Sequence, residues 1–181
     1  MLTIRQVTPE DIPTVRTLAS EIWLEYYPAI LSHEQIDYML AWMYAPEVIR
    51  AELDAGVVWE LGFLESQTAG FLSYVLQEDR LEVKLHKLYL RPSLHGQGLG
   101  RQLLTHVTCH AQAMGARRIR LQVNKRNERA IRAYQRAGFR VAESIVSSIG
   151  GGFVMDDYVM SLDLTGTSLR QPANKDTLDS P

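Results

Sequence analysis

A glycine-rich stretch in the middle of the chain has the composition of a binding site for an anion. Gly96, Gly98 and Gly100 fall within five residues, after Pro92 has ended a predicted strand and just before a predicted helix. Glycine lets backbone N–H groups approach a ligand closely, and the first turn of a helix adds unpaired N–H donors and a partial positive charge. The stretch therefore predicts a diphosphate-binding turn, although an ordinary strand-to-helix turn also uses glycine.

Two well-known phosphate loops do not fit this stretch. A Rossmann loop, G-x-G-x-x-G, needs a glycine where Arg101 stands, and the next predicted strand ends without an acidic residue, in Gln122-Val123-Asn124. A P-loop closes on Gly-Lys-Ser or Gly-Lys-Thr, whereas this chain has Gly98-Leu99-Gly100. The sequence therefore predicts neither dinucleotide binding of the Rossmann type nor nucleoside-triphosphate chemistry.

Polar side chains that could share one ligand follow on the next predicted helix. Asn127 and Tyr134 are seven residues apart, so a helix with 100° per residue places them on one face. Both side chains can then contact the same molecule. The alternative is that Tyr134 belongs to an amphipathic core face with its hydroxyl in water.

Two histidines and the single cysteine lie on the helix that follows the glycine-rich turn. His106 and His110 are four residues apart, the spacing of a helical metal-binding pair. No glutamate follows the first histidine and the sequence indicates no third ligand, so we expect solvent-exposed histidines and no metal. Cys109, as the only cysteine, excludes an internal disulfide and a multi-cysteine metal site, which suits a reducing compartment.

Alternating strands and helices must position these candidate residues. Apolar residues at period two predict strands, and apolar residues three and four apart predict helices. Thr8 and Ser32 are the expected N-caps of the first two helices, and residues 149–152 are the expected hinge of a final antiparallel hairpin. The order indicates a mixed α/β sheet with helices on both faces. Strands are expected over residues 2–7, 57–64, 69–76, 81–90, 119–123, 139–147 and 153–162, and helices over 9–26, 33–43, 98–114 and 127–137, with a short one from Pro46.

The size and composition are those of one globular domain. The chain has 181 residues, of which 46% are hydrophobic and 22% are charged. We expect one domain over residues 1–164 and a polar, mobile tail over residues 165–181. Because no signal peptide or apolar membrane span is evident, we expect a cytoplasmic protein without a membrane partner.

The net charge of −2 conceals three blocks of opposite sign. Residues 1–83 carry −10, residues 84–140 carry +12 and residues 141–181 carry −4. The basic block predicts an anionic ligand or a nucleic acid, and the acidic blocks suit a neutral or cationic ligand elsewhere. Basic residues do not alternate with aromatic ones in residues 84–140, which argues against nucleic acid. The alternative reading of the arginines is a solvated surface.

Two motifs resemble the GNAT superfamily of acyl-CoA-dependent N-acetyltransferases. The cofactor loop of that family, Q/R-x-x-G-x-G/A, is matched by residues 95–100 except at the first position, where His95 stands. The resemblance is specific over residues 81–139. It implies a mixed, mostly antiparallel central sheet with helices on both faces and a V-shaped splay between two central parallel strands. A second family motif, N-x-x-A-x-x-x-Y-x-x-x-G-F, is matched in full by Asn127, Ala130, Tyr134, Gly138 and Phe139.

The resemblance implies acetyl-CoA as co-substrate and direct attack of a primary amine on its thioester in a ternary complex. No covalent enzyme intermediate is expected. Tyr134 is placed near the thioester sulfur, where its hydroxyl protonates the departing thiolate as general acid. The residues implied to bind the cofactor are Leu88, Tyr89, Leu90, His95, Gly96, Gln97, Gly98, Leu99, Gly100, Arg101 and Asn127.

The attacking amine must first lose a proton, because an ammonium group with a pKa of about 10 has no lone pair. His86 is our first candidate for the base, since an imidazole with a pKa of about 6.5 suits neutral pH. It is expected on the same strand face as Leu88, and related arylalkylamine N-acetyltransferases carry a histidine at the matching point. A histidine that is merely hydrogen-bonded in place is the alternative, and Glu82 ranks below His86.

The acceptor is expected to be a small amine or polyamine. The early helices and the final hairpin wall the acceptor cleft in this superfamily, and aromatic rings beside carboxylates can hold a cation. The combination of residues 23–28, residues 31–39 and a closing strand with an Asp-Tyr pair looks like that of bacterial spermidine/spermine-type acetyltransferases. The alternatives are a peptide N-acetyltransferase, a non-catalytic acyl-CoA-binding module and a nucleic-acid-binding module, and a homodimer is possible. The residues expected to bind the acceptor are Trp23, Tyr26, Tyr27, Asp156 and Asp157.

Overall fold

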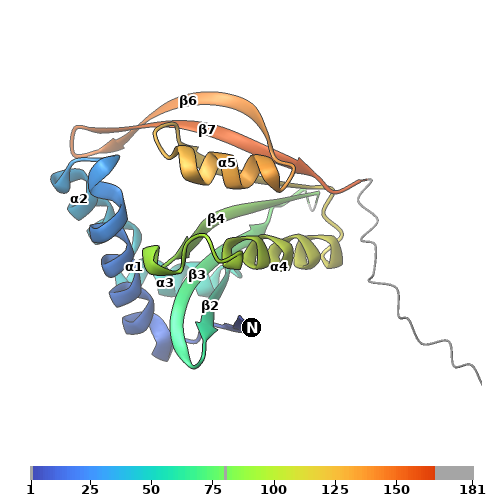
Figure 1. The fold of residues 1–181 in the computed structure, drawn as a ribbon, viewed down its shortest axis with the longest axis horizontal. Helices are drawn as coiled ribbons and strands as arrows, with labels where there is room; N and C mark the ends of the chain where they lie inside the picture. Colours follow the sequence, from blue (N-terminus) through green and yellow to red (C-terminus); the bar gives the residue numbers. More distant parts are fainter. Residues whose placement is uncertain (1, 80, 166–181) are drawn as a thin grey trace, which may run out of the picture.

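A mixed sheet of seven strands organises the described residues, 2–79 and 81–165, of a computed structural model (Figure 1). The strand order is β1-β2-β3-β4-β5-β7-β6, and all neighbouring pairs are antiparallel except β4 and β5. The predicted mixed, mostly antiparallel sheet is therefore confirmed. Residues 166–181 of the expected tail lie outside the described residues. The strands are β1 (Thr3–Gln6), β2 (Val58–Leu64), β3 (Gln67–Leu76), β4 (Glu82–Leu90), β5 (Arg118–Asn124), β6 (Arg140–Gly150) and β7 (Phe153–Asp163).

Helices cover both faces of the sheet, as predicted. On one face, α1 (Ile12–Tyr26), α2 (His33–Met43) and α3 (Pro46–Asp54) enclose an aromatic core, and we call this the α1–α3 face. On the other, the α4–α5 face, α4 (Leu99–Ala113) and α5 (Glu128–Arg136) pack on an aliphatic core. Within residues 2–79 and 81–165, none of these helices is long and apolar enough to cross a membrane.

The strands β4 and β5 pair only along their first halves. Their parallel register joins residues 82–85 to residues 118–121. Both strands continue past this pairing, to Leu90 and Asn124, so their carboxyl-terminal halves diverge. The V-shaped splay implied by the family resemblance is thereby confirmed. It leaves one side of the second half of β4 without a neighbouring strand.

A β-bulge in β4 falls at His86. Ser73 of β3 pairs with Lys87 and the next residue of β3 pairs with Leu85, so His86 has no partner. An extra residue breaks the period-two alternation of a strand. Leu88 packs on the α4–α5 face, whereas His86 borders a cavity with α2 and α3 residues. The expectation that His86 and Leu88 share one strand face is therefore wrong.

Tight turns close the β2–β3 hairpin and the predicted β6–β7 hairpin. Between β2 and β3, Glu65 and Ser66 have φ angles of 50° and 69°. Between β6 and β7, Gly151 and Gly152 have φ angles of 59° and 81°. Two successive residues with positive φ match the twist of a hairpin. The second turn can therefore be read from its glycines, and the first cannot.

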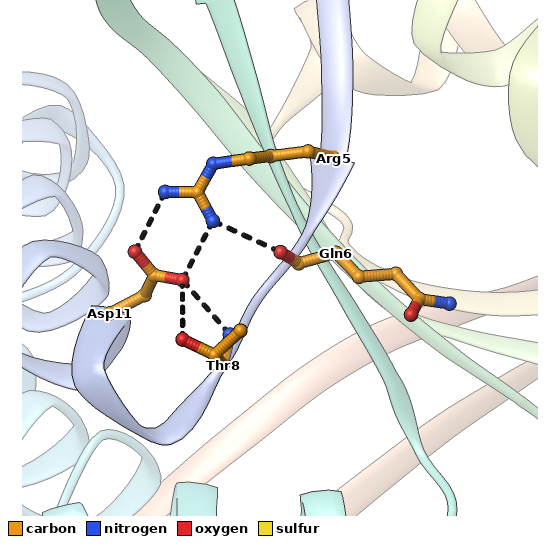
Figure 2. Close-up of polar contacts among 4 residues, drawn as sticks. All are labelled: Arg5, Gln6, Thr8 and Asp11. Atoms are coloured by element: carbon orange, nitrogen blue, oxygen red, sulfur yellow. Dashed lines mark hydrogen bonds and ion pairs between the residues drawn. The ribbon is translucent and has the colours of Figure 1, made fainter.

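The corner between β1 and α1 is fixed by one carboxylate (Figure 2). Asp11 accepts hydrogen bonds from the Thr8 N–H at 2.9 Å and the Thr8 hydroxyl at 3.1 Å. Both ends of the Arg5 guanidinium donate to the same carboxylate at 2.7 Å, and this hydrogen bonding holds the pKa of Asp11 far below its usual value. The predicted helix start at Thr8 is confirmed, but its first turn, Pro9–Asp11, is a 3₁₀ turn.

The tip of the β6–β7 hairpin reaches across to α2 (Figure 1). The Tyr38 hydroxyl donates to the Ile149 carbonyl at 2.7 Å, and the Gln35 amide donates to the Val154 carbonyl at 3.0 Å. These bonds join residues more than a hundred positions apart in the sequence. They fix the hairpin over the α1–α3 face.

Candidate active site

A cavity of about 1190 Å³ lies where β4 and β5 diverge. Its walls come from α1, α2, the second half of β4, the glycine-rich turn, α4, β5, α5 and the β6–β7 hairpin. Ligand sites in proteins commonly have roughly 300–1,000 Å³, so the space suits a long cofactor together with a second molecule. The splay is thus the feature that creates the site.

The main chain of β4 presents hydrogen-bonding groups to this cavity. In an antiparallel pair, successive residues point these groups alternately toward and away from the neighbouring strand. The Arg91 N–H donates to the Ala69 carbonyl of β3 at 2.9 Å, and the register continues unbroken past Leu88. The groups of Leu88 and Leu90 therefore point away from β3, into the splay. The Leu90 carbonyl accepts a hydrogen bond from His95 Nε2 at 3.1 Å.

The glycine-rich turn has the geometry that its composition predicted. Gly96 and Gly98 have φ angles of +84° and +78°, and a Cβ on either would meet open space. Gly98 is also the N-cap of α4. For the N–H groups of residues 96–101, no acceptor lies within hydrogen-bond distance in the described part of the chain. Successive unpaired N–H groups at a helix start fit a diphosphate.

His95, the residue that departs from the family loop motif, turns back toward the protein. Besides its bond to the Leu90 carbonyl, its ring lies edge-on to Tyr26, with ring centroids 5.4 Å apart. Burial and the charge of Arg129 lower the pKa of His95. The His95 side chain therefore links the glycine-rich turn to the end of β4.

Arginines supply positive charge around the cavity. Arg101 of α4 and Arg129 and Arg136 of α5 all line it. None of the three has a carboxylate within ion-pair distance among residues 2–79 and 81–165. The basic block of the sequence is thus represented in the cavity wall, as expected for an anionic ligand.

Asn127 and Tyr134 both line the cavity, as their spacing predicted. Asn127 is the N-cap of α5, and its Oδ1 accepts bonds from the Ala130 N–H at 3.2 Å and from the Tyr26 hydroxyl at 2.9 Å. Its side-chain N–H groups have no partner in the described residues and so can reach a ligand. The Tyr26 bond ties α1 to α5 across the cavity.

Tyr134 is held as a neutral phenol. Its ring packs against Phe139, with centroids 5.6 Å apart, and burial raises the pKa of its hydroxyl to about 12. Within residues 2–79 and 81–165, that hydroxyl makes no hydrogen bond to a protein group. The phenol is therefore protonated at neutral pH and available to a ligand in the cavity.

His86 is a weaker base than its residue type suggests. Burial and the charges of Lys84 and Lys87 lower the pKa of its imidazole to about 4. The expectation of a pKa near 6.5 is therefore not met, because the sequence shows the two neighbouring lysines but not the burial of the ring, which is the larger cause of the shift. His86 also borders a second, smaller cavity of about 300 Å³, with Trp42 of α2 and Glu52 of α3.

The two aspartates of β7 lie in different surroundings, one in the cavity wall and one exposed to solvent. Asp157 lines the cavity, is 8% exposed, and its Oδ1 has no hydrogen-bond partner among the described residues. Burial and the charge of Asp156 raise the pKa of Asp157 to about 6. Asp156 is exposed, forms an ion pair with Lys125 and lies outside the cavity wall. Strand alternation separates the pair, so that of the two aspartates expected to bind the acceptor only Asp157 lines the cavity.

The predicted aromatic residues form a rigid wall rather than an open surface. Trp23 and Tyr27 are 1% and 8% exposed, and their rings stack with centroids 4.4 Å apart. Both also border the cavity, and both pack against Tyr89 of β4. Tyr26 is half-buried and has its hydroxyl on Asn127. Trp23 and Tyr27 thus belong to the core behind the cavity.

A buried charge that the sequence did not reveal lies next to the site. Lys87 is 5% exposed, and its ammonium group lies 3.6 Å from the Glu52 carboxylate and 4.6 Å from the centre of the Trp59 ring. Burial lowers the pKa of this lysine. A lysine among the apolar positions of a predicted central strand was the only available signal.

The chain is similar to known acetyltransferases over the residues that form the site. The family model "Acetyltransferase (GNAT) family" matches residues 16–139, which include the glycine-rich turn, Asn127 and Tyr134. A spermidine N(1)-acetyltransferase of Thermoplasma acidophilum is 26% identical over 158 residues, which cover 84% of this chain and 94% of that protein. An uncharacterised N-acetyltransferase of Mycobacterium tuberculosis is 35% identical over 100 residues, covering 55% of this chain and 63% of that protein.

Solved structures share the fold at low sequence identity. The PaiA N-acetyltransferase of Thermoplasma acidophilum in complex with coenzyme A has a TM-score of 0.75 at 23% identity, covering 90% of this chain and 99% of that chain. A putative acetyltransferase of Salmonella typhimurium, yncA, with acetyl-CoA has a TM-score of 0.64 at 22% identity, covering 100% and 98%. With the family model matched over two motifs and a fitting cavity, the chain belongs to the acetyltransferase (GNAT) family and is an acetyl-CoA-dependent acetyltransferase.

Proposed function

We propose that this enzyme acetylates a primary amine of a small molecule, with polyamines among its substrates. The observation that carries the proposal is the Asp157 carboxylate, which is buried in the cavity wall and has an oxygen without a partner in the described residues. A buried carboxylate of this kind favours a cationic ligand. The Thermoplasma relative that is named a spermidine acetyltransferase supports the same substrate class.

Acetyl-CoA would lie along the splay. The unpaired N–H groups of residues 96–101 would hold its diphosphate, with Arg101 adding charge. The pantetheine arm would run from the turn along β4 and pair with the main-chain groups of Leu88 and Leu90 that face the splay, with the amide of Asn127 beside it. One of these two main-chain N–H groups would polarise the thioester carbonyl, and one such donor is worth roughly 3 kcal/mol to an oxyanion.

Asp157 is the base that the cavity favours. A base works best when its pKa lies near the operating pH, and Asp157, at about 6, is closer to neutral than His86, at about 4. Asp157 would bind the ammonium group, accept its proton and leave the amine lone pair free to attack the thioester carbon. His86 would serve as a polar part of the acceptor wall.

Tyr134 would complete the transfer. When the tetrahedral intermediate collapses, the carbon–sulfur bond breaks and the sulfur leaves as a thiolate. The Tyr134 phenol, protonated at neutral pH because its pKa is about 12, would donate a proton or a hydrogen bond to that sulfur. General-acid help of this kind contributes roughly 10²–10⁴-fold. The reaction needs no covalent enzyme intermediate.

The hairpin contact argues for a small acceptor over a peptide. Tyr38 and Gln35 of α2 bond to the main chain of the β6–β7 hairpin, and Ile149 and Met155 of that hairpin line the cavity. An extended peptide would need an open groove on this side. The bonded hairpin therefore favours a compact amine.

The test is acetyl-CoA-dependent thiol release with a panel of small amines, polyamines and peptides. We expect the small amines to give the highest kcat/KM. D157N should lower kcat/KM roughly 10²-fold, with the acetyl-CoA Kd unchanged by calorimetry.

The matched control is D156N, which removes the neighbouring carboxylate outside the cavity wall. It should change kcat/KM far less than D157N does, because it keeps the Asp157 carboxylate and removes only the smaller cause of its raised pKa. Acetylation of peptides alone, or equal losses in both variants, would contradict the proposed acceptor and the role of Asp157.

A further inference from the structure

We propose that Glu60, His106 and His110 form a binding site for a divalent transition-metal ion such as Zn²⁺. The site lies between β2 and α4 on the α4–α5 face, and none of the three residues lines the acetyltransferase cavity. Sequence analysis found the histidine pair but no third ligand. The fold supplies that ligand as Glu60, 46 positions before His106.

The three side chains already converge. His106 Nε2 lies 2.9 Å from a Glu60 carboxylate oxygen, and the rings of His106 and His110 have centroids 4.2 Å apart. One potential ligand atom from each residue lies within 4.8 Å of the other two. Around a tetrahedral Zn²⁺ with bonds of about 2.0–2.2 Å, ligand atoms are roughly 3.3 Å apart. The longest separation must therefore shorten by at most roughly 1.5 Å, which side-chain rotations can provide.

The surroundings resemble those of a bound metal. The Glu60 side chain is only 4% exposed, and a buried carboxylate is costly unless cations or donors compensate it. The Tyr74 hydroxyl lies 2.9 Å from His110 Nδ1, and bonding at one ring nitrogen orients the imidazole for the other ligands. The His106 side chain, at 23% exposed, leaves an entry path from solvent. The expectation of two fully solvent-exposed histidines is therefore wrong for His106.

The ligand set selects the class of ion. Two imidazoles and one carboxylate suit Zn²⁺, Co²⁺ or Ni²⁺, whereas Mg²⁺ and Ca²⁺ prefer oxygen ligands alone. With three protein ligands, water would take the fourth position of a tetrahedral ion. Binding would link β2 to the middle of α4, the helix whose first turn carries the proposed diphosphate site. We therefore expect the ion to stabilise the fold without entering the reaction.

The test uses tag-free, full-length protein that has been dialysed against a chelator. Calorimetric titration with ZnCl₂ should give one saturable site, and bound Co²⁺ should develop visible absorption. If the Kd is about 1 μM, then 100 μM Zn²⁺ should raise the Tm by roughly 5–10 °C.

Two variants and a control decide the assignment. H110A, which leaves the Glu60–His106 bond in place, should weaken Zn²⁺ binding at least tenfold, and H106A/H110A should abolish it. H33A removes an exposed histidine at the start of α2 and should bind like the wild type. Absence of saturable binding by the wild type, or equal affinity in H106A/H110A, would overturn the proposal. Circular dichroism of each variant without metal separates lost binding from lost folding.

Discussion

Replacing Asp157 by asparagine should raise the free energy of unfolding and lower the kcat/KM of the enzyme. The carboxyl group is buried, and burial with the charge of Asp156 raises its pKa from 3.8 to about 6. The folded protein then holds this proton more tightly than the unfolded chain, so ionisation at neutral pH destabilises the fold. At about 1.36 kcal/mol per pH unit, the rise corresponds to roughly 3 kcal/mol. The asparagine amide also needs hydrogen-bond partners, so we expect a net gain of about 1–2 kcal/mol at pH 7.

The stability advantage of D157N over the wild type should depend on pH. Below pH 3.8, Asp157 is protonated in both the folded and the unfolded state, and its ionisation costs nothing. The destabilisation develops as the pH rises from 3.8 to about 6 and is complete above that. Urea unfolding should therefore show the advantage of D157N at pH 7 and lose it at pH 4. D156N, the control at the adjacent exposed position, keeps the buried carboxyl group and removes only the smaller of the two causes of its raised pKa, so its advantage at pH 7 should be smaller than that of D157N. A D157N protein that is less stable than the wild type by the same amount at both pH values would refute the reasoning.

Four other predictions concern the cofactor turn, the general acid, the base and the first helix. G98E should weaken acetyl-CoA binding at least 100-fold by calorimetry, because it adds backbone strain and a negative charge at the proposed diphosphate site. The control G56E, at a glycine with a similar φ of +81° away from the cavity, should bind acetyl-CoA like the wild type. Wild-type affinity in G98E would contradict the diphosphate site. Y134F should lower kcat roughly 10²-fold with normal acetyl-CoA affinity, and an unchanged kcat removes the general acid. From pH 8 to pH 5, kcat/KM should fall about tenfold if Asp157 is the base but only about 10% if His86 is, so a flat profile excludes Asp157. D11N should lower the Tm at neutral pH, because Asp11 has a lowered pKa in the folded protein and its ionised form stabilises the fold. The difference in Tm between wild type and D11N should shrink in acid, where Asp11 of the wild type becomes protonated. A Tm difference that stays constant with pH would contradict this role.

Local signals in the sequence sufficed for the elements and for the cofactor turn. The glycines at positions 96 and 98 predicted a turn that an anion can approach closely, and in the structure both have positive φ and open space around them. The spacing of Asn127 and Tyr134 predicted a shared ligand, and both line one cavity. These features depend on residues close together in the chain. The splay needed the family resemblance, because nothing local indicates where two parallel strands stop pairing.

Other parts of the site depend on contacts that the sequence does not encode locally. The bulge at His86 is set by pairing with β3, and it moves the side chain off the face that simple alternation assigns. Burial of the imidazole in the fold, with the charges of the neighbouring Lys84 and Lys87, lowers its pKa to about 4. Asp156 and Asp157 are identical in type and adjacent, so only the position of β7 in the sheet tells which one faces the cavity. The third ligand for the histidine pair comes from β2, far away in the chain.

The proposed site consists of groups that the protein leaves without partners. The N–H groups of residues 96–101, the main-chain groups of Leu88 at the splay and the Asp157 carboxylate each lack a hydrogen-bond partner in the described residues where a more stable fold would supply one. Filling any of them from within the chain would stabilise the protein and close the cavity. A diphosphate, a pantetheine arm and an ammonium group have the complementary chemistry for these three sets, in that order. The stability gained in D157N and the activity lost in it are therefore two measurements of the same unmet interaction.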